Sequence, residues 1–330
     1  NEVLSIGLNE IIRVSSFLVM FLVMFLMIES ERDYYTYIKV VILSALFPAF
    51  IGFVEFLTGA GLYSNPGFEN RIAGTFGHPN VFAYYLMIVI SLVGATVLHT
   101  KWLSKNDRPF LVLLAGGYSF LLVQTFTRGA WIGLFLIGYL TLLTKFLKRT
   151  LVGTALVAVL AGIFIASYVA VNQFEFVELP PLDSNPLVKR VTDLFAEDPS
   201  DSVIWRRNIW ADMFETGLQR PVRGHGTGSI EYVTEQVRGL ALGALEVHND
   251  YIKVFVEMGT IGLFMYLLLI AGMMAYFLDF YRTSKNVYVL VVLYIIIALY
   301  FSSFYDNLLR QTANMWIFFG LVGATIRYGM

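Results

Sequence analysis

Hydrophobic positions along the chain form a series of long apolar runs that are separated by short polar links. A transmembrane helix needs about 20 mostly apolar residues to cross the hydrocarbon core of a bilayer. Runs of this length recur from one end of the sequence to the other. They predict about nine membrane-spanning helices, at residues 11–28, 37–58, 80–98, 109–126, 129–147, 151–171, 250–279, 287–304 and 313–327.

One sizeable polar stretch interrupts these runs, at residues 172–249. It contains the turn-rich sequence PPLDSNP and a helical pattern at 203–217, and it lacks the alternation of a β-strand. We therefore interpret residues 1–330 as a single transmembrane domain, an all-α polytopic helix bundle with one large, partly helical extracytoplasmic loop. The chain begins with Asn1 rather than Met, and we expect a longer N-terminus.

Basic residues in the short links predict the orientation. Lys and Arg are enriched on the cytoplasmic side of a membrane, and every second link is basic. These residues are Lys101, Lys105, Arg108, Lys145, Lys148, Arg149, Arg282, Lys285 and Arg327. The other, outer side then holds the links at 71–80 and 127–129, the polar stretch 172–249, and the link 306–310.

Composition agrees with a membrane protein and narrows its chemistry. The sequence is 57% hydrophobic and only 14% charged, whereas soluble domains carry roughly 25% charged residues. Its net charge of -1 leaves no basic surface for a nucleic acid. Cysteine is absent from the sequence, which excludes disulfides and thiolate metal sites.

Five unusual polar sequences all map to the predicted outer side. They are GTFGHPN at 74–80, TRG at 127–129, WRRNIW at 205–210, PVRGHGTG at 221–228 and HND at 248–250. Polar groups from distant segments that gather at one end of a bundle are typical of a binding site between helices. The alternative is that outer loops must be polar somewhere.

His248 is the strongest candidate for chemistry. On a helix, Ile252, Phe255, Gly259 and Gly262 would form one stripe below it, and small residues on that stripe would let a neighbouring helix approach closely. Glu257 would face the opposite way and is a poor partner for the histidine. The alternative is an interfacial histidine that caps a span.

Arginines supply candidate anion-binding groups. Arg128 lies between two apolar runs, where it is either an anchor at the membrane surface or a clamp for phosphate oxygens. Arg206 and Arg207, beside two tryptophans, offer further positive charge or dock the loop. Asn80 either caps a helix or lines the site, and we expect a structural role for His78.

Other site chemistries find little support. The glycines of GHGTG follow no strand and precede no lysine, so a turn is favoured over a phosphate-binding loop. The outer segments contain neither a DxD-like acidic cluster nor an HExxH motif, and we expect no metal and no cofactor. A serine hydrolase is disfavoured because no GxSxG sequence is present.

Together these motifs resemble a known family. His248-Asn249, nine residues, Gly259, two residues and Gly262 resemble the HN-x9-GxxG signature of the bacterial O-antigen ligase superfamily. TRG is similar to its (S/T)RG turn, GTFGHPN to its GTFxxPN element, and WRRNIW with PVRGHGTG to its R…W…PxxGxGxG loop. The matches follow family order over about residues 70–265. Family members usually have more N-terminal spans, and the loop arginine corresponds to either Arg206 or Arg207.

The resemblance implies a GT-C-like glycosyltransferase. Such enzymes move a glycan from undecaprenyl diphosphate at the outer face of the bacterial inner membrane. Ligases pass it to lipid A-core, polymerases to another lipid-linked repeat unit, and related enzymes to protein. By this resemblance His248 is the catalytic base. Arg128 and Arg206 or Arg207 bind the leaving diphosphate in place of a metal. Asn249 and Asn80 are predicted to bind substrate.

A lipid or glycan transporter is the competing interpretation. Transporters tend to place ionisable groups near the bilayer midplane, between internal repeats with broken helices. Here the polar motifs gather at one predicted face, and no internal repeat is evident in the sequence. The sequence therefore favours the enzyme.

Overall fold

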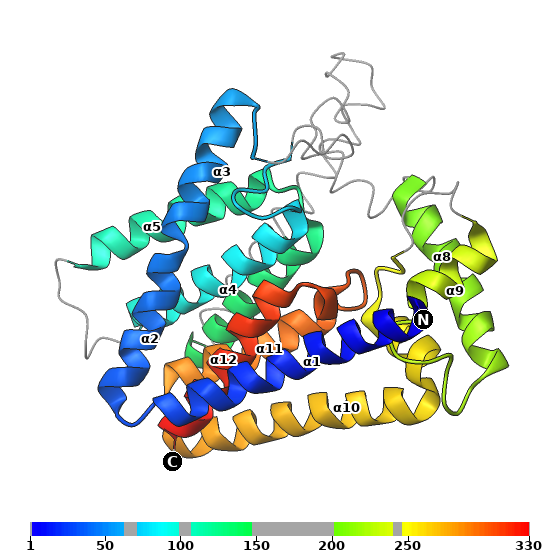
Figure 1. Ribbon diagram of the computed structural model, residues 1–330. Coiled ribbons are helices and arrows are strands. Elements are labelled where there is room, and N and C mark those ends of the chain that lie inside the picture. Colours follow the sequence, from blue (N-terminus) through cyan, green and yellow to red (C-terminus); the bar gives the residue numbers. More distant parts are fainter. Residues whose placement is uncertain (1, 63–70, 99–106, 147–200, 240–245, 330) are drawn as a thin grey trace, which may run out of the picture.

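The computed structural model describes residues 2–62, 71–98, 107–146, 201–239 and 246–329. Within these ranges the regular structure is helical and no strand occurs, which confirms the all-α class (Figure 1). The helices are α1 (Glu2–Met27), α2 (Glu31–Ser44), α3 (Leu46–Thr58), α4 (Pro79–Leu98), α5 (Asp107–Gln124), α8 (Asp201–Gln219), α9 (Ile230–Arg238), α10 (Asp250–Ser284), α11 (Val287–Ser302), the short 3-10 helix η3 (Leu308–Arg310) and α12 (Thr312–Tyr328). Residues 128–146 are also helical.

The predicted spans can be compared with these helices one by one. Every predicted run coincides with helical residues except 151–171, which lies outside the described residues. Among the described residues, four helical segments are long and apolar enough to cross a membrane: Ser5–Met27, Glu31–Thr58, Pro79–Leu98 and Asp250–Ser284. The protein is thus a helical membrane protein, and the number of about nine spans remains a prediction.

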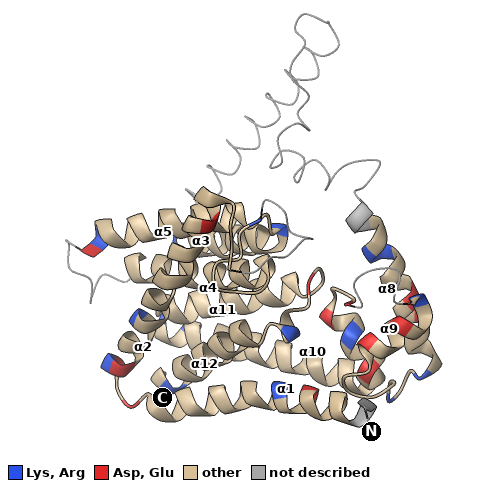
Figure 2. Cartoon of the chain, turned by 45° about the horizontal axis from the view of Figure 1, so that its top comes forward, with Lys and Arg blue, Asp and Glu red and all other residues tan. Residues whose placement is uncertain are grey.

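Burial divides the helices into a central and a peripheral set. The side chains of α4 and α11 are mostly buried and form the middle of the bundle. The apolar side chains of α1 and α10 are mostly exposed at its periphery. An apolar helix with an exposed apolar surface is expected where lipid rather than water is the solvent. Figure 2 agrees, because charged residues gather mainly around α8 and α9 and near the start of α2, with a largely uncharged bundle between them.

The described part of the polar stretch 172–249 includes α8 and α9. Both helices lie at the end of the bundle where α10 begins (Figure 1). The buried side of α8 contributes Ile209 and Met213 to a small apolar cluster that also includes Val256 of α10. This cluster fixes α8 against the first turns of α10, and the stretch is partly helical, as predicted.

The helix α10 is broken at Gly259, and this corrects the predicted stripe below His248. Gly259 has φ 67° and ψ −163°, so Ile252 and Phe255 lie on a different helical segment from Gly262. The added Cβ of an alanine at 259 would lie 2.6 Å from the backbone nitrogen of Arg223. The glycine therefore admits a loop, and not a neighbouring helix as the sequence suggested.

That loop, residues 221–226, supplies the hydrogen bonds that the break removes from α10. The N–H groups of His225 and Gly226 donate to the carbonyls of Val256 (2.8 Å) and Glu257 (2.9 Å). The N–H of Thr260 donates to the carbonyl of Pro221 at 2.7 Å. Buried helix ends need such partners. The motifs PVRGHGTG and GxxG, far apart in the sequence, are therefore two halves of one backbone joint.

The glycines of the loop fit this role. Gly224 and Gly226 in the loop, and Gly228 just after it, have φ values of 68°, 110° and 81°, which non-glycine residues rarely adopt. A Cβ on Gly224 would also lie 2.5 Å from the backbone nitrogen of Met258. The loop is a turn packed on α10, as the sequence favoured.

Candidate functional site

Segments from four parts of the chain meet where α10 begins. The imidazole of His248 lies at the centre, and its Nδ1 is 3.6 Å from Oδ1 of Asp306, in the link between α11 and α12. At this distance the two atoms are close but lie beyond the usual range of a hydrogen bond. The indole of Trp205 on α8 contacts the imidazole edge-on, with 5.9 Å between ring centroids. The histidine is thus held between a carboxylate and an aromatic ring.

His248 keeps access to the surroundings while its partner does not. Its side chain is 18% exposed, against 8% for Asp306. Its backbone has φ 51°, and it directly precedes Asn249, the N-cap of α10. The positive φ turns the chain between Val247 and the start of α10. The histidine therefore stands beside the first turn of the helix rather than within it.

Asp306 was not predicted as a site residue. Its Oδ2 accepts a hydrogen bond from Asn80 Nδ2 at 2.7 Å, and its Oδ1 accepts one from the N–H of Asn307 at 2.8 Å. Burial acts to raise the pKa of this carboxyl, but His248, the Asn307 N–H and His78 outweigh it and hold the pKa below its ordinary value. Asp306 is therefore ionised at neutral pH.

Asn80 links the carboxylate to an arginine that the sequence did not single out. Its Oδ1 accepts hydrogen bonds from Arg71 Nη2 at 2.7 Å and from Thr127 Oγ1 at 3.2 Å. Arg71 Nε also donates to the carbonyl of Thr125 at 2.8 Å. Both polar atoms of the Asn80 side chain are thus engaged by the protein, and substrate binding by Asn80 stays a prediction.

His78 belongs to the same cluster in a supporting position. Its Nδ1 accepts a hydrogen bond from the N–H of Asn80 at 3.0 Å, which helps to start α4. Burial lowers the pKa of His78, the Asp306 carboxylate opposes this, and the Arg71 guanidinium adds to the lowering. A neutral histidine that accepts from the backbone fits the structural role expected for it.

Arg128 begins the helix at 128–146, directly after Thr127 of the Asn80 network, and its side chain is half-buried. The glycine that follows it has a packing reason. A Cβ on Gly129 would overlap the hydroxyl of Tyr84 on α4. The TRG sequence therefore brings the start of this helix into contact with α4 beside the cluster.

The structure distinguishes the two arginines that the sequence left as alternatives. Arg206 is half-buried. Among the described residues its Nε has no hydrogen-bond partner. Arg207 is exposed. The segment is anchored by Trp210, whose Nε1 donates to the carbonyl of Val247 at 2.8 Å, one residue before His248.

Asn249 is the N-cap of α10. Its Oδ1 accepts hydrogen bonds from the N–H groups of Tyr251 and Ile252, both at 3.0 Å, and its side chain is buried. Side chains that accept from the first helical N–H groups are preferred at this position. Its predicted contact with substrate is not tested by this geometry.

The remaining candidates fall outside the cluster. Glu257 pairs with Lys253 at 2.7 Å, in agreement with the expectation that it is a poor partner for His248. His225 places Nε2 3.0 Å from the carbonyl of Thr216 and so belongs to the joint between loop and α8. Among the described residues, no group of three or more metal-ligating side chains occurs. Metal independence stays a prediction.

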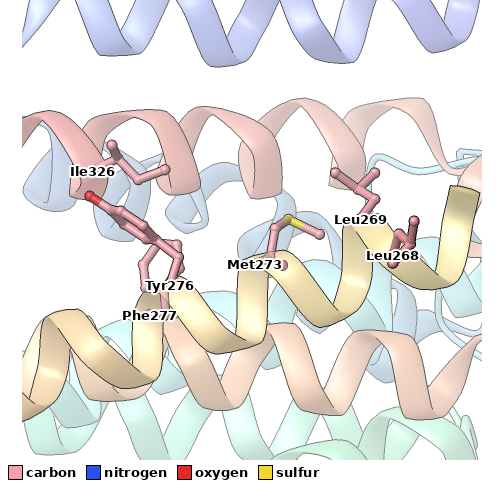
Figure 3. Close-up of a pocket in the computed structure, with 7 residues that line it drawn as sticks. Leu268, Leu269, Met273, Tyr276, Phe277 and Ile326 are labelled. Carbon is pink, nitrogen blue, oxygen red and sulfur yellow. The ribbon is translucent and has the colours of Figure 1, made fainter.

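A separate apolar hollow of about 360 Å³ lies along α10, far from its start (Figure 3). Its lining contains no charged group, and it consists of Leu268, Leu269, Gly272, Met273, Tyr276, Phe277 and Ile326. A site for polar group transfer needs a few convergent polar groups. The cluster around His248 meets that requirement, and this hollow does not.

Comparison with known proteins agrees with the motifs. The family model described as O-Antigen ligase matches residues 109–267, which include Arg128, Arg206, His248 and Gly259. The match confirms the resemblance and supports a place for this membrane protein in the O-antigen ligase/polymerase-like superfamily. The family indicates glycan transfer of the ligase or polymerase type, with lipid-linked glycans as substrates. A comparison with curated proteins gives no match.

Asp306, Asn80 and Arg71 lie outside the matched residues. Only the fold brings them to His248. The sequence singled out Asn80 but not the other two, whose signal was weak: Asp306 is a single acidic residue in a short link between apolar runs, and Arg71 stands just before GTFGHPN.

Proposed function

We propose that this protein is a metal-independent glycosyltransferase of the O-antigen ligase type. It transfers a glycan from an undecaprenyl-diphosphate donor to a hydroxyl of lipid A-core, at the outer face of the bacterial inner membrane. The observation that carries the proposal is the partly exposed His248 facing the buried, ionised Asp306, with Arg206 on the adjacent helix.

The His248–Asp306 pair fits general base catalysis. With the Nδ1–H directed at Asp306, the Nε2 of His248 is left to take the proton of the acceptor hydroxyl. The acceptor oxygen then bonds to the anomeric carbon, and the bond from that carbon to the diphosphate oxygen breaks. The Asp306 carboxylate stabilises the imidazolium that forms. The proton leaves His248 for the released diphosphate or water.

The arginines fit the other half of the reaction. Negative charge grows on the diphosphate as it leaves, and guanidinium groups stabilise such charge with paired hydrogen bonds. Arg206 is half-buried, and its Nε is without a hydrogen-bond partner within the described residues. We assign this role to Arg206 and Arg128, and we assign docking or solvation to the exposed Arg207.

The length of α10 supports a location of the site at the outer surface of the membrane. Its segment after the break, residues 260–284, spans about 37 Å at 1.5 Å per residue, which is enough to cross a hydrocarbon core of about 30 Å. With Arg282 and Lys285 at the inner surface, Gly259 reaches the outer surface. His248 then lies at the headgroup level, where the diphosphate of a lipid-linked donor is found.

The decisive experiment measures glycan transfer by purified protein in lipid, with a lipid-diphosphate glycan donor and EDTA present. General base catalysis typically contributes about 10²–10⁴-fold, so His248→Ala should bind donor normally and lose turnover on that scale. Wild-type turnover should fall as the pH decreases and the base becomes protonated. Asp306 stays ionised while His248 becomes protonated, because the pKa of the Asp306 carboxyl is held below its ordinary value.

A matched control is His225→Gln, which changes a histidine of the loop joint, and it should stay within a few-fold of wild type. Near-normal turnover of His248→Ala would leave that residue a span-capping histidine and refute the mechanism. Activity that EDTA abolishes and magnesium restores would refute metal independence.

The acceptor distinguishes the ligase from its relatives, because a polymerase or a protein O-oligosaccharyltransferase would use the same base and clamp. Mass spectrometry of surface glycans after gene deletion tests this. A ligase leaves full-length polymer that is not attached to lipid A-core. Accumulation of single repeat units would instead identify a polymerase, and glycan missing from protein would identify the third activity.

A further inference from the structure

Asp250 is a fully buried acidic residue to which the proposed reaction assigns no step. It follows Asn249 at the first position of α10 and has a relative exposure of 0%. Its N–H donates to the carbonyl of Ser303 at 2.9 Å. Its Oδ2 accepts a hydrogen bond from the N–H of Leu309 at 3.1 Å. One residue thus binds the backbone of the link between α11 and α12 at two points.

Those two points enclose Asp306. Ser303 and Leu309 each lie three residues from it, one on either side. Because His248 lies two residues before Asp250, the residue that binds the link also stands close to the imidazole along the chain. We infer that Asp250 is a positioning residue that holds the link 303–309 so that the Asp306 carboxylate faces His248. This inference rests on the proposed function.

The contacts define which property of Asp250 matters. The bond to Leu309 requires an acceptor oxygen at the reach of an aspartate side chain, and an amide oxygen serves equally well. The second oxygen, Oδ1, makes no hydrogen bond of ordinary geometry among the described residues, although the Ser303 side chain and Lys253 also act on the carboxylate. For the bond to Leu309 itself, the length of the side chain and the acceptor oxygen matter, and the negative charge does not.

The geometry of the pair makes it sensitive to this support. At 3.6 Å, the His248–Asp306 contact is already longer than a hydrogen bond, so further displacement of the link would uncouple the two groups. A misplacement of about 1 Å at a catalytic group can reduce turnover about 10²-fold. Loss of the Leu309 bond releases one end of a seven-residue link and permits such a movement.

The first test compares truncation with conservative replacement in the purified protein. Asp250→Ala and Asp250→Ser remove the acceptor or shorten its reach, and both should lower turnover by about ten-fold or more. Both should also move the acid limb of the pH–rate profile to lower pH, because the imidazolium loses its carboxylate partner. Asp250→Asn keeps the acceptor and should restore turnover to within about three-fold, with the limb in its wild-type place.

The second test is a double-mutant cycle with Asp306→Ala. If Asp250 acts through Asp306, adding Asp250→Ala to Asp306→Ala should change turnover less than about two-fold. Equal losses in both backgrounds, or an unmoved acid limb, would show general damage and overturn the inference. An inactive Asp250→Asn would also overturn it. So would truncations that fail to fold beside a fully active Asp250→Asn.

The outcome is separable from that of the proposed function. Normal turnover by His248→Ala would remove the base and therefore the proposed mechanism. An inactive His248→Ala together with an additive Asp250–Asp306 cycle would leave the mechanism in place and refute only the positioning role.

Discussion

Replacing Gly259 by alanine should destabilise the protein through the joint between α10 and the loop 221–226. The residue has φ 67° and ψ −163°, which L-residues with a Cβ rarely adopt. The new Cβ would lie 2.6 Å from the backbone nitrogen of Arg223 and would also overlap the carbonyl of Val222. Neither obstacle is the end of a flexible side chain, so the loop itself must move.

The magnitude follows from two contributions. A strained backbone conformation costs about 1–3 kcal/mol, and an overpacked contact costs about 1–3 kcal/mol more. The total of about 2–6 kcal/mol exceeds that of most single substitutions. Gly272→Ala is the matched control on the same helix, because no atom lies within 4 Å of its added Cβ. There alanine should be neutral or stabilise by about 0.5–1 kcal/mol.

The assay is thermal unfolding of each purified variant in the same detergent, followed by tryptophan fluorescence. Gly259→Ala should unfold well below the wild type and Gly272→Ala at or slightly above it. Equal midpoints for the two alanine variants would refute the broken helix at Gly259. A loss of glycan transfer with an unchanged midpoint would instead give the glycine a role in admitting substrate.

Two further predictions follow from the placement of the site. Arg206→Gln and Arg128→Lys should each reduce turnover roughly ten- to hundred-fold, because a charged hydrogen bond of about 1.5–3 kcal/mol is lost. The control Arg207→Gln should remain near wild type. Equal activity of all three variants would make the arginines membrane anchors. Single cysteines introduced at Arg223 and Lys285 of this cysteine-free chain should differ in labelling by an impermeant maleimide in intact cells, with only position 223 labelled. Labelling of position 285 alone would reverse the orientation and contradict the proposed location of the active site.

The local sequence determined much of the fold. Long apolar runs predicted helices that the structure shows at 11–28, 80–98, 250–279 and elsewhere, because a span must satisfy its own backbone hydrogen bonds within lipid. Local motifs also identified His248 and the glycine loop, since each depends on neighbours within a few residues. The sequence could not separate Arg206 from Arg207, because adjacent residues differ only in the side of the helix that packs.

The helical spacing of residues along the sequence did not predict the break in α10 at Gly259. A stripe of residues at helical spacing assumes an unbroken helix, and the break is stable only because residues 221–226 supply the missing partners. That compensation is a contact between segments more than thirty residues apart. No count along one helix can reveal it.

In the candidate site, too, some features followed from the sequence and others only from the tertiary structure. The sequence alone determined a helical membrane protein with a histidine, arginines and glycines of the O-antigen ligase pattern. The tertiary structure alone decided that Asp306 faces His248, that Asn80 joins this carboxylate to Arg71, and that Asp250 accepts a hydrogen bond from the link between α11 and α12. The reason is physical: a carboxylate has no preferred partner along the chain, and its role is set by whichever donors the packing of distant helices brings within about 3–4 Å.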